Sequence, residues 1–297
     1  MSASVRVGNG RNAMKFTKMH GCGNDYIYVY TGTEYINDED KPRLAERLSD
    51  RHTGIGSDGL IFINPVDGAD FEMEMYNSDG SKGAMCGNGI RCVGKYVYDH
   101  SLTDKTTLDI LTGAGVKRLE LKVENGTAVG ATVNMGKPVL EASKIPVVMN
   151  GCDDTKPVIS IPIDIKKCGY NITCVSMGNP HCVIFVDNPV ENVDLLDLGP
   201  LFEHHVIFPD RINTEFNNVL DRSHLAMRVW ERGAGETMAC GTGACASVVA
   251  AVLNGLTERE VRVSLTGGDL DIKWDESDGC VYMTGPAETS FEGEVNV

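Results

Sequence analysis

The sequence has little that would connect it to nucleic acid or to a membrane. Its 297 residues hold only 27 Lys and Arg against 42 Asp and Glu, a net charge of −15, and so acidic a surface repels a phosphate backbone. No apolar run approaches the roughly 20 residues of a membrane helix. The most apolar stretch, Ala244 to Leu253, is short and favours a buried helix. We therefore expect neither a nucleic-acid partner nor a membrane anchor.

The ten cysteines lack the spacing of a metal site or a disulfide framework. No Cys-x-x-Cys pair occurs in the sequence, and its first residues do not have the pattern of a secretory signal. These absences favour a reduced, cytoplasmic protein without a metal. Residues 1–13 contain no hydrophobic segment, and we expect them to form a flexible extension. The length predicts two domains.

Short runs rich in Val, Ile, Tyr and Phe, bounded by Gly, Asn and Asp, predict strands, and longer periodic runs predict helices. The expected strands are Tyr26–Tyr30, Leu60–Ile63, Phe71–Tyr76, Leu119–Val123, Val183–Val186, Ala226–Trp230 and Val261–Leu265; the expected helices are Lys41–Arg51, Gly89–Asp99 and Gly243–Leu253. The pattern is that of an α/β (α+β) chain dominated by sheet.

The chain repeats itself at a fixed distance. Cys86–Gly89 and Cys240–Gly243 share the pattern Cys-Gly-x-Gly at a shift of 240 − 86 = 154 residues, and each precedes an expected helix. Weaker features repeat at nearly the same shift: Gly-Asn turns at Asn24 and Asn179, 179 − 24 = 155 residues apart, and polar residues at Asn77 and Glu231, nine positions before each cysteine. A duplicated chain predicts two similar halves that face each other across a pseudo-twofold axis.

A cysteine at a helix start lies where unpaired amide N–H groups and the positive end of the helix dipole favour a thiolate. The same amides can hold a carboxylate. Two such cysteines facing one cavity suit inversion at a carbon acid, in which one thiolate removes a proton and the opposite thiol returns one. We expect this of Cys86 and Cys240. The other eight cysteines are expected to be core residues: Cys22, Cys92, Cys152, Cys168, Cys174, Cys182, Cys245 and Cys280.

Five collinear segments resemble the diaminopimelate epimerase family. They are Lys15–Tyr30 (KFTKMHGCGNDYIYVY), Met75–Lys95 (MYNSDGSKGAMCGNGIRCVGK), Met177–His181 (MGNPH), Arg211–Asn213 (RIN) and Trp230–Ala246 (WERGAGETMACGTGACA). The resemblance implies a cofactor-independent, PLP-independent isomerase that interconverts LL- and meso-diaminopimelate in lysine biosynthesis. It also implies two pseudo-symmetric domains, each a curved mixed sheet around a central helix, and a homodimer. We expect the domains at 14–135 plus 286–297 and at 136–285.

The resemblance assigns roles to individual residues. Cys86 and Cys240 correspond to the acid/base thiols, with His181 and Glu231 as auxiliary catalytic residues. The substrate contacts fall on a wider set: Asn24, Asn77, Gly87, Asn88, Asn179, Asn213, Glu231, Arg232, Gly241 and Thr242. Gly59 stands where many members have Gln, and Ser57 of the same turn could substitute for that contact.

Two kinds of alternative stay open at this point. An amino-acid racemase of the proline racemase type also pairs two thiols, although Glu231, Arg232 and the four Asn favour a substrate with a charged distal end. A non-catalytic module that binds an amino acid or a metal is the alternative from another class, and only the number of cysteines favours the metal.

Overall fold

The protein is described by a computed structural model that covers residues 13–149 and 153–297. The expected extension, residues 1–13, lies outside this range except for Ala13. That residue belongs to the first strand and pairs with Asn296. For the residues before it the extension stays a prediction. Cys152 also lies outside the described residues.

The described residues form one mixed sheet with four α-helices and three short 3-10 helices. Its strands are β1 (Ala13–Gly21), β2 (Asn24–Tyr30), β3 (Gly59–Asn64), β4 (Phe71–Asn77), β5 (Lys82–Gly83), β6 (Thr107–Thr112), β7 (Gly115–Glu124), β8 (Thr127–Gly136), β9 (Ile161–Ile165), β10 (Cys168–Ser176), β11 (Pro180–Phe185), β12 (Asn213–Asp221), β13 (His224–Glu231), β14 (Gly235–Glu236), β15 (Glu260–Leu265), β16 (Gly268–Trp274), β17 (Val281–Pro286) and β18 (Glu288–Asn296). The helices are α1 (Lys41–Ser49), α2 (Gly87–Asp99), α3 (Leu195–Glu203), α4 (Gly241–Leu253), η1 (Asp38–Asp40), η2 (Ala142–Lys144) and η3 (Val190–Asn192).

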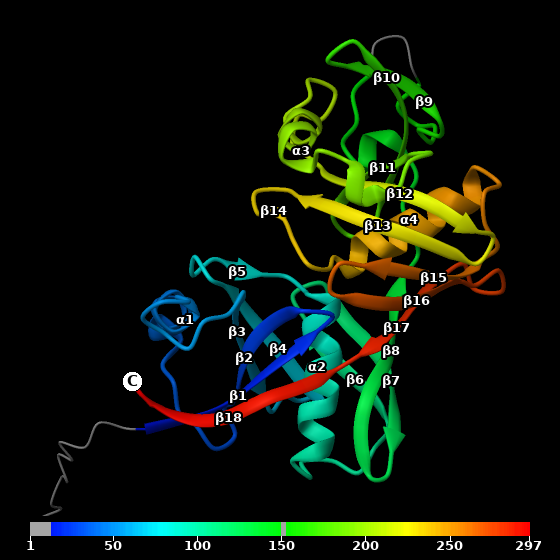
Figure 1. The fold of residues 1–297 in the computed structure, drawn as a ribbon. Helices are drawn as coiled ribbons and strands as arrows, with labels where there is room; N and C mark the ends of the chain where they lie inside the picture. The colour runs from blue at the N-terminus through cyan, green and yellow to red at the C-terminus, as the bar shows by residue number, and fades with distance from the viewer. Residues whose placement is uncertain (1–12, 150–152) are drawn as a thin grey trace, which may run out of the picture.

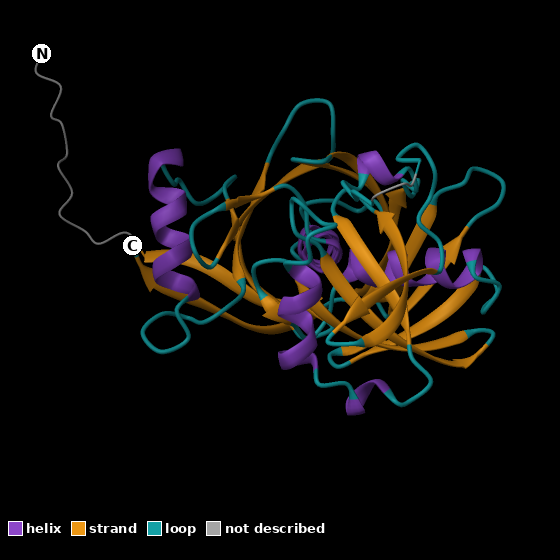
Figure 2. Ribbon diagram, turned by 90° about the horizontal axis from the view of Figure 1, so that it is seen from above, coloured by secondary structure: helices purple, strands orange, loops and turns teal. Residues whose placement is uncertain are grey.

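The elements divide into two lobes, one built around α2 and the other around α4 (Figure 1). Viewed from above, the strands curve around the helices (Figure 2). Hydrogen-bonded neighbours run without a break from β18 through β1, β2, β3, β4, β6, β7 and β8 to β17, and on through β16, β15, β13, β12, β11 and β10 to β9. The β8–β17 pair therefore joins the lobes.

The two halves of the sequence repeat one element order. In each half, two strands, a helix, two long strands and a two-residue strand precede the central helix, and four strands follow it. The central helices have the same length of 13 residues and begin 241 − 87 = 154 residues apart. The parallel pairs β2–β3 and β11–β12 also correspond. These observations confirm the expected pseudo-symmetric fold class.

The last strand of each half of the sequence pairs with the first strand of the other half. β18 returns from β17 to lie against β1 of the first half, and β9 lies against β10 of the second. The domain boundaries at residues 136 and 286 stay a prediction.

The central helices explain the position of the core. Ten residues of α4 are buried, including Ala244–Ala251, and a helix that is apolar on all sides requires a surrounding sheet. α2 carries the charged residue Arg91 in the core, where it is fully buried and donates to the carbonyl oxygens of Gly87 and Pro286. The guanidinium thus connects α2 to β17 between the lobes.

All ten predicted elements are confirmed, whereas eleven of the described strands and α3 were not predicted. Both central helices begin two residues before the predicted Gly89 and Gly243, so the glycines lie inside the first turn. Cys168 is exposed and Cys280 half-buried, so the prediction of core positions was wrong for these two. Within the part of the chain described, none of the helices has the length and apolar character needed to cross a membrane.

Candidate active site

Cys86 and Cys240 each occupy the N-cap position of a central helix. Cys86 has extended backbone, and its sulfur accepts the amide N–H of Gly89 at 3.3 Å. Cys240 has the same extended backbone at the start of α4, and its sulfur lies 3.5 Å from the hydroxyl of Thr242. A sulfur at the N-cap lies beside the free amides of the first turn.

The two helix starts meet in the structure. Asn88 Nδ2 of α2 donates to the carbonyl oxygen of Ala239, which precedes Cys240, at 3.2 Å. A Cβ atom at Gly87 would lie 2.8 Å from Met283 Cε, and one at Gly241 would lie 2.9 Å from Met283 Sδ. Met283 of β17 thus packs closely against both first turns. Gly87, Asn88, Gly241 and the two cysteines come together as the sequence predicts.

Asn24 links Cys86 to the strands of its own lobe. Its Oδ1 accepts the Cys86 thiol at 3.2 Å, and its Nδ2 donates to Asp58 at 2.7 Å. Asp58 is itself paired with Arg51 at 2.9 Å. The side chain of Asn24 is therefore fixed from both ends, with its oxygen toward the sulfur. The Tyr26 phenol, two residues further along β2, also hydrogen-bonds the Cys86 sulfur.

Glu231, at the end of β13, acts on both sulfurs. Its carboxyl hydrogen-bonds Cys240, and its Oε1 accepts the Thr237 hydroxyl at 2.5 Å. Its charge is close enough to both Cys86 and Cys240 to disfavour either thiolate. One carboxyl thus faces two thiols that are 154 residues apart in the chain.

The pKa values of both thiols are raised, contrary to the lowering expected from the helix starts. Burial raises the pKa of Cys86, while the amides of Gly89 and Asn88 lower it by a smaller amount. Burial raises the pKa of Cys240 well above its usual value, and the charges of Glu231 and Glu215 add to that rise. Loss of hydration outweighs the effect of the helix amides at both thiols, because a thiolate loses more than a thiol on leaving water. Burial also raises the pKa of Glu231.

His181 lies in a buried row of polar groups behind the second helix start. Its Nδ1 bonds Glu215 Oε1 at 2.7 Å, and its Nε2 is 3.0 Å from Asn179 Oδ1. The side chains of His181 and Glu215 are both fully buried. The predicted residues Asn179, in the turn before β11, and His181, on β11, are thus hydrogen-bonded to each other, and Glu215 of β12 holds the other side of the His181 ring.

The remaining predicted contact residues make hydrogen bonds to their own surroundings. Asn213 Nδ2 donates to the carbonyl oxygen of Pro180 at 2.7 Å, and its Oδ1 accepts the backbone N–H of Arg232 at 2.9 Å. The Arg232 guanidinium is exposed and donates to the carbonyl oxygen of Asp210. Asn77 donates to the Ser81 hydroxyl at 2.9 Å.

Ser57 does not have the free hydroxyl that a substitute contact requires. It is buried and donates to the carbonyl oxygen of Gly59 at 2.9 Å, inside its own turn. A Cβ at Gly59 would lie 2.2 Å from the carbonyl oxygen of Tyr76 and 2.8 Å from the ring of Tyr26. This backbone therefore accepts only glycine at that position, and the Tyr26 ring occupies the adjacent space.

Three residues that the sequence reasoning missed belong to this region: Tyr26, Asp58 and Glu215. Tyr26 and Glu215 lie inside strands and resemble ordinary strand residues in the sequence. The 154-residue repeat was the available signal, because it pairs Tyr26 with His181 and Glu215 with Ile61 to within one residue. A charged residue opposite an isoleucine in a duplicated chain marks a position where the halves have different tasks.

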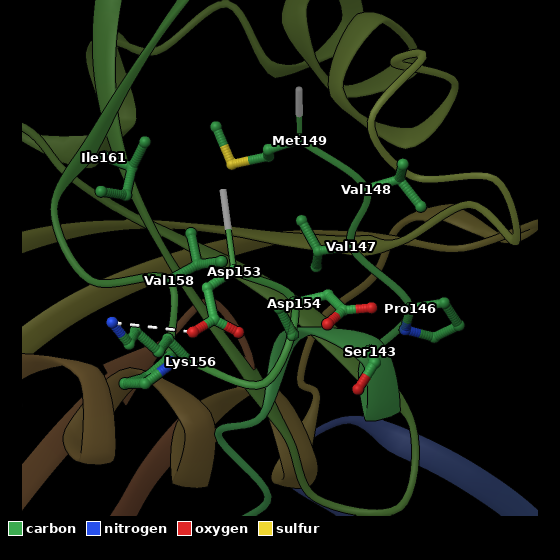
Figure 3. Close-up of a pocket in the computed structure, with 12 residues that line it drawn as sticks. Ser143, Pro146, Val147, Val148, Met149, Asp153, Asp154, Lys156, Val158 and Ile161 are labelled. Carbon is green, nitrogen blue, oxygen red and sulfur yellow. Dashed lines mark ion pairs between the residues drawn. The ribbon is translucent and has the colours of Figure 1, made fainter. Parts of the chain in front are cut away.

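A separate cavity of about 670 Å³ opens in the second lobe, between η2 and β9. It is lined by apolar side chains such as Val147, Met149 and Val158, with the ion pair of Asp153 and Lys156 at its rim (Figure 3). None of the predicted site residues lines it. Over the described ranges, no three His, Cys, Asp or Glu side chains gather as metal ligands would.

Solved structures place this fold in a class of two-lobed proteins that includes amino-acid epimerases. A hydroxyproline epimerase from Agrobacterium vitis, with bound trans-4-hydroxy-L-proline, matches 95% of this chain and 91% of its own at a TM-score of 0.66 and 13% identity. A phenazine biosynthesis protein of the PhzF family from Bacillus anthracis matches 96% and 100% at 0.68 and 17% identity. At such identities the likeness defines the fold.

Sequence comparison then specifies the family within that class. The model of the diaminopimelate epimerase family matches residues 16–141 and 173–290. A diaminopimelate epimerase from Methanococcus maripaludis strain C5 is 55% identical over 284 residues, 96% of this chain and all of that protein. One from Acetivibrio thermocellus is 54% identical over 284 residues, 96% of this chain and 99% of that protein. The chain belongs to the diaminopimelate epimerase family.

Proposed function

We propose that this protein interconverts LL- and meso-diaminopimelate by proton transfer between the substrate α-carbon and two thiols, Cys86 and Cys240. The observation that carries the proposal is the meeting of the two helix starts, with a cysteine at each N-cap and one carboxyl, Glu231, acting on both. Membership of the family supports the choice of substrate.

The first turns of α2 and α4 supply the binding site for the reacting carboxylate. Their free amides, at Gly87–Asn88 and Gly241–Thr242, carry partial positive charge and suit an anion. Asn88 Oδ1 is buried and has no hydrogen-bond partner among the described residues, so it is available to an ammonium group. An amino acid placed between the helix starts thus presents its α-carbon to both sulfurs.

The distal end of diaminopimelate carries a second carboxylate and a second ammonium group. Arg232, Asn213 and Asn77 provide a guanidinium and two amides for these groups. The guanidinium is exposed, so it can turn from Asp210 toward a ligand. These charges favour diaminopimelate over proline, which has no distal charge.

The proton transfers balance without any other reactant. The thiolate of one cysteine takes the α-proton from one face of the carbon, and the electron pair of the broken C–H bond stays on the substrate. The thiol of the other cysteine then gives its proton to the opposite face and becomes the thiolate. The reverse reaction uses the same groups with their roles exchanged.

The amides that bind the carboxylate also stabilise the transition state. Charge from the α-carbon spreads onto the carboxylate oxygens as the proton leaves, and fixed N–H groups in a site with little water stabilise that charge strongly. The raised pKa values of both thiols act in the same direction, since a thiolate with a raised pKa is a stronger base.

The assay that tests the proposal offers four substrates to the purified protein in parallel. LL-diaminopimelate, meso-diaminopimelate, L-proline and trans-4-hydroxy-L-proline are incubated, and the stereoisomers are separated by chiral chromatography. We expect both diaminopimelate isomers to reach the same mixture while proline and hydroxyproline stay unchanged. Turnover of proline alone would move the protein to the proline racemase type, and turnover of none would contradict the proposal.

A further inference from the structure

Glu215 has no counterpart of its own kind in the first half. The register of β11 with β12 corresponds to that of β2 with β3, so Glu215 occupies the place that Ile61 has in the first half. Both side chains pack against the second glycine of a Cys-Gly-x-Gly motif. A Cβ at Gly89 would lie 2.8 Å from Ile61 Cδ1, and one at Gly243 would lie 2.7 Å from Glu215 Oε1. The second half therefore has the carboxylate of Glu215 where the first half has the Ile61 methyl group, against the first turn of its central helix.

The fold itself does not require a carboxylate at this position. Ile61 fills the equivalent space as a fully buried apolar residue, and its lobe packs normally around it. Glu215 is also fully buried, and its Oε2 has no hydrogen-bond partner among the described residues. A buried, incompletely satisfied carboxylate is unfavourable for folding. Its presence therefore calls for a chemical reason.

We propose that Glu215 is a positioning residue, which holds His181 through Nδ1 and makes the two thiols of the site unequal. The inference rests on the proposed function, because it assigns Glu215 to the same two-thiol site. The carboxylate accepts the Nδ1–H of His181 at 2.7 Å and so fixes both the ring orientation and the nitrogen that carries the proton. This leaves Nε2 toward Asn179.

The same carboxylate also acts on Cys240. It lies against the first turn of α4, and its charge favours the protonated thiol of Cys240. The first half has Tyr26 and Ile61 instead, and the Tyr26 phenol favours the thiolate of Cys86. The proton thus resides preferentially on Cys240, and Cys86 is the thiol that ionises first.

Other ionisable groups face this region and define the controls. Glu231 approaches Cys240 from β13, and His181 contacts Glu215 from β11. The charge of Glu215 also acts on Cys182, which lies on the opposite face of β11. Thr242 hydroxyl lies beside Cys240 on its own helix. Replacing Glu215 by Gln removes one charge and leaves all these groups in place, with an amide oxygen that can still accept the Nδ1–H.

The test measures the alkylation rate of each thiol against pH, by mass spectrometry after reaction with iodoacetamide. Trypsin releases Cys86 in the peptide Gly83–Arg91 and Cys240 in Gly233–Arg259; because the second peptide also contains Cys245, fragmentation of the peptide assigns the label to Cys240. In Glu215→Gln we expect the midpoint of the Cys240 profile to move down by about one pH unit, with that of Cys86 unchanged. Glu215→Asp, which keeps the charge, should keep the Cys240 midpoint within a few tenths of a unit of wild type.

Glu74→Gln is the matched control, because Glu74 is a largely buried glutamate of the first half, paired with Lys41 and Lys82. It should move neither profile. A Glu215→Gln protein with an unmoved Cys240 midpoint, or with both midpoints moved equally, would overturn the proposal. If Glu215→Gln does not fold, ¹⁵N NMR of the wild-type His181 ring decides: a protonated Nδ1 supports the proposal, and an unprotonated Nδ1 overturns it.

Turnover of diaminopimelate by the wild type is measured alongside. Its absence would contradict the proposed function while the alkylation profiles still report on Glu215. The two proposals can therefore fail separately.

Discussion

The start of α2 and the start of α4 share a cysteine, two glycines and an extended N-cap, while the strands behind them differ. Behind Cys86, one face of β3 presents Gly59, Ile61 and Ile63. The equivalent face of β12 presents Asn213, Glu215 and Asn217, all of them buried, and Glu215 acts on Cys240. The backbone of the duplicated fold thus imposes symmetry on the thiols, and the side chains on neighbouring strands remove it.

The comparison shows how a symmetric fold supports a reaction that needs two unequal groups. Inversion requires one thiolate and one thiol at the same time. Two thiols in identical surroundings would share one proton without preference. The carboxylates of Glu215 and Glu231 instead favour the protonated form of Cys240. The pKa of Cys240 is accordingly raised further than that of Cys86.

The largest effect is expected from removing either thiol. We expect Cys86→Ser and Cys240→Ser each to lower the conversion of LL- to meso-diaminopimelate by about 10³-fold, because each takes away one of the two proton carriers. Chiral chromatography of timed samples measures the rate. Cys168→Ser is the control, since this exposed thiol lies in the second half outside the site. Near-normal conversion by either single variant would show that one half suffices.

The pH dependence of kcat/KM follows from the raised thiol pKa values. A thiol whose pKa is raised is protonated at neutral pH, so the fraction of enzyme with one thiolate grows as pH rises. We expect kcat/KM to increase about tenfold per pH unit from pH 6 toward the pKa of Cys86, and to fall only when Cys240 also ionises. Steady-state rates across pH 6 to 10 measure it. A flat profile from pH 6 to 8 would contradict the protonation states described above.

The two Asn turns offer a smaller, direct comparison of the halves. Asn24 accepts the Cys86 thiol, whereas Asn179 contacts His181. Asn24→Ala should therefore lower kcat by about tenfold, the effect of losing one hydrogen bond at the reacting sulfur, and move the Cys86 alkylation profile. Asn179→Ala should leave the Cys86 profile unchanged. Equal effects of both variants on Cys86 would show that the turns act only on the overall fold.

The smallest effect is expected at Tyr26. Its phenol lowers the pKa of Cys86, so Tyr26→Phe should raise the midpoint of the Cys86 alkylation profile by roughly half a pH unit. The shift is upward because the thiolate loses a donor, opposite to the downward shift expected at Cys240 for Glu215→Gln. Iodoacetamide labelling with peptide mapping measures both. A downward shift in Tyr26→Phe would contradict the role of the phenol.

The sequence predicts the apolar elements of this fold well and the polar ones poorly. α4 and β11 are apolar and were placed nearly correctly. The polar strand β12 (NTEFNNVLD) was missed, because its Asn and Glu have low strand propensity and are buried for the sake of the site. α3 was missed as well, because Gly199 and Pro200 lie inside it.

The candidate site shows the same division. The repeated cysteines and Gly-Asn turns are visible as local patterns, and the structure brings them together. Glu215 and Tyr26 became visible only through the register of neighbouring strands, since their relation to the sulfurs depends on pairing between distant segments. The thiol pKa values were predicted in the wrong direction because burial cannot be read from a local motif.

Exchange of the substrate α-proton in deuterium oxide tests the central claim most directly. Wild type, Cys86→Ala and Cys240→Ala are incubated with each diaminopimelate isomer, and NMR follows both loss of the α-proton signal and the stereoisomer formed. We expect the wild type to incorporate solvent deuterium with inversion, and each alanine variant to lose inversion. Inversion at an undiminished rate in either variant would contradict the two-thiol account.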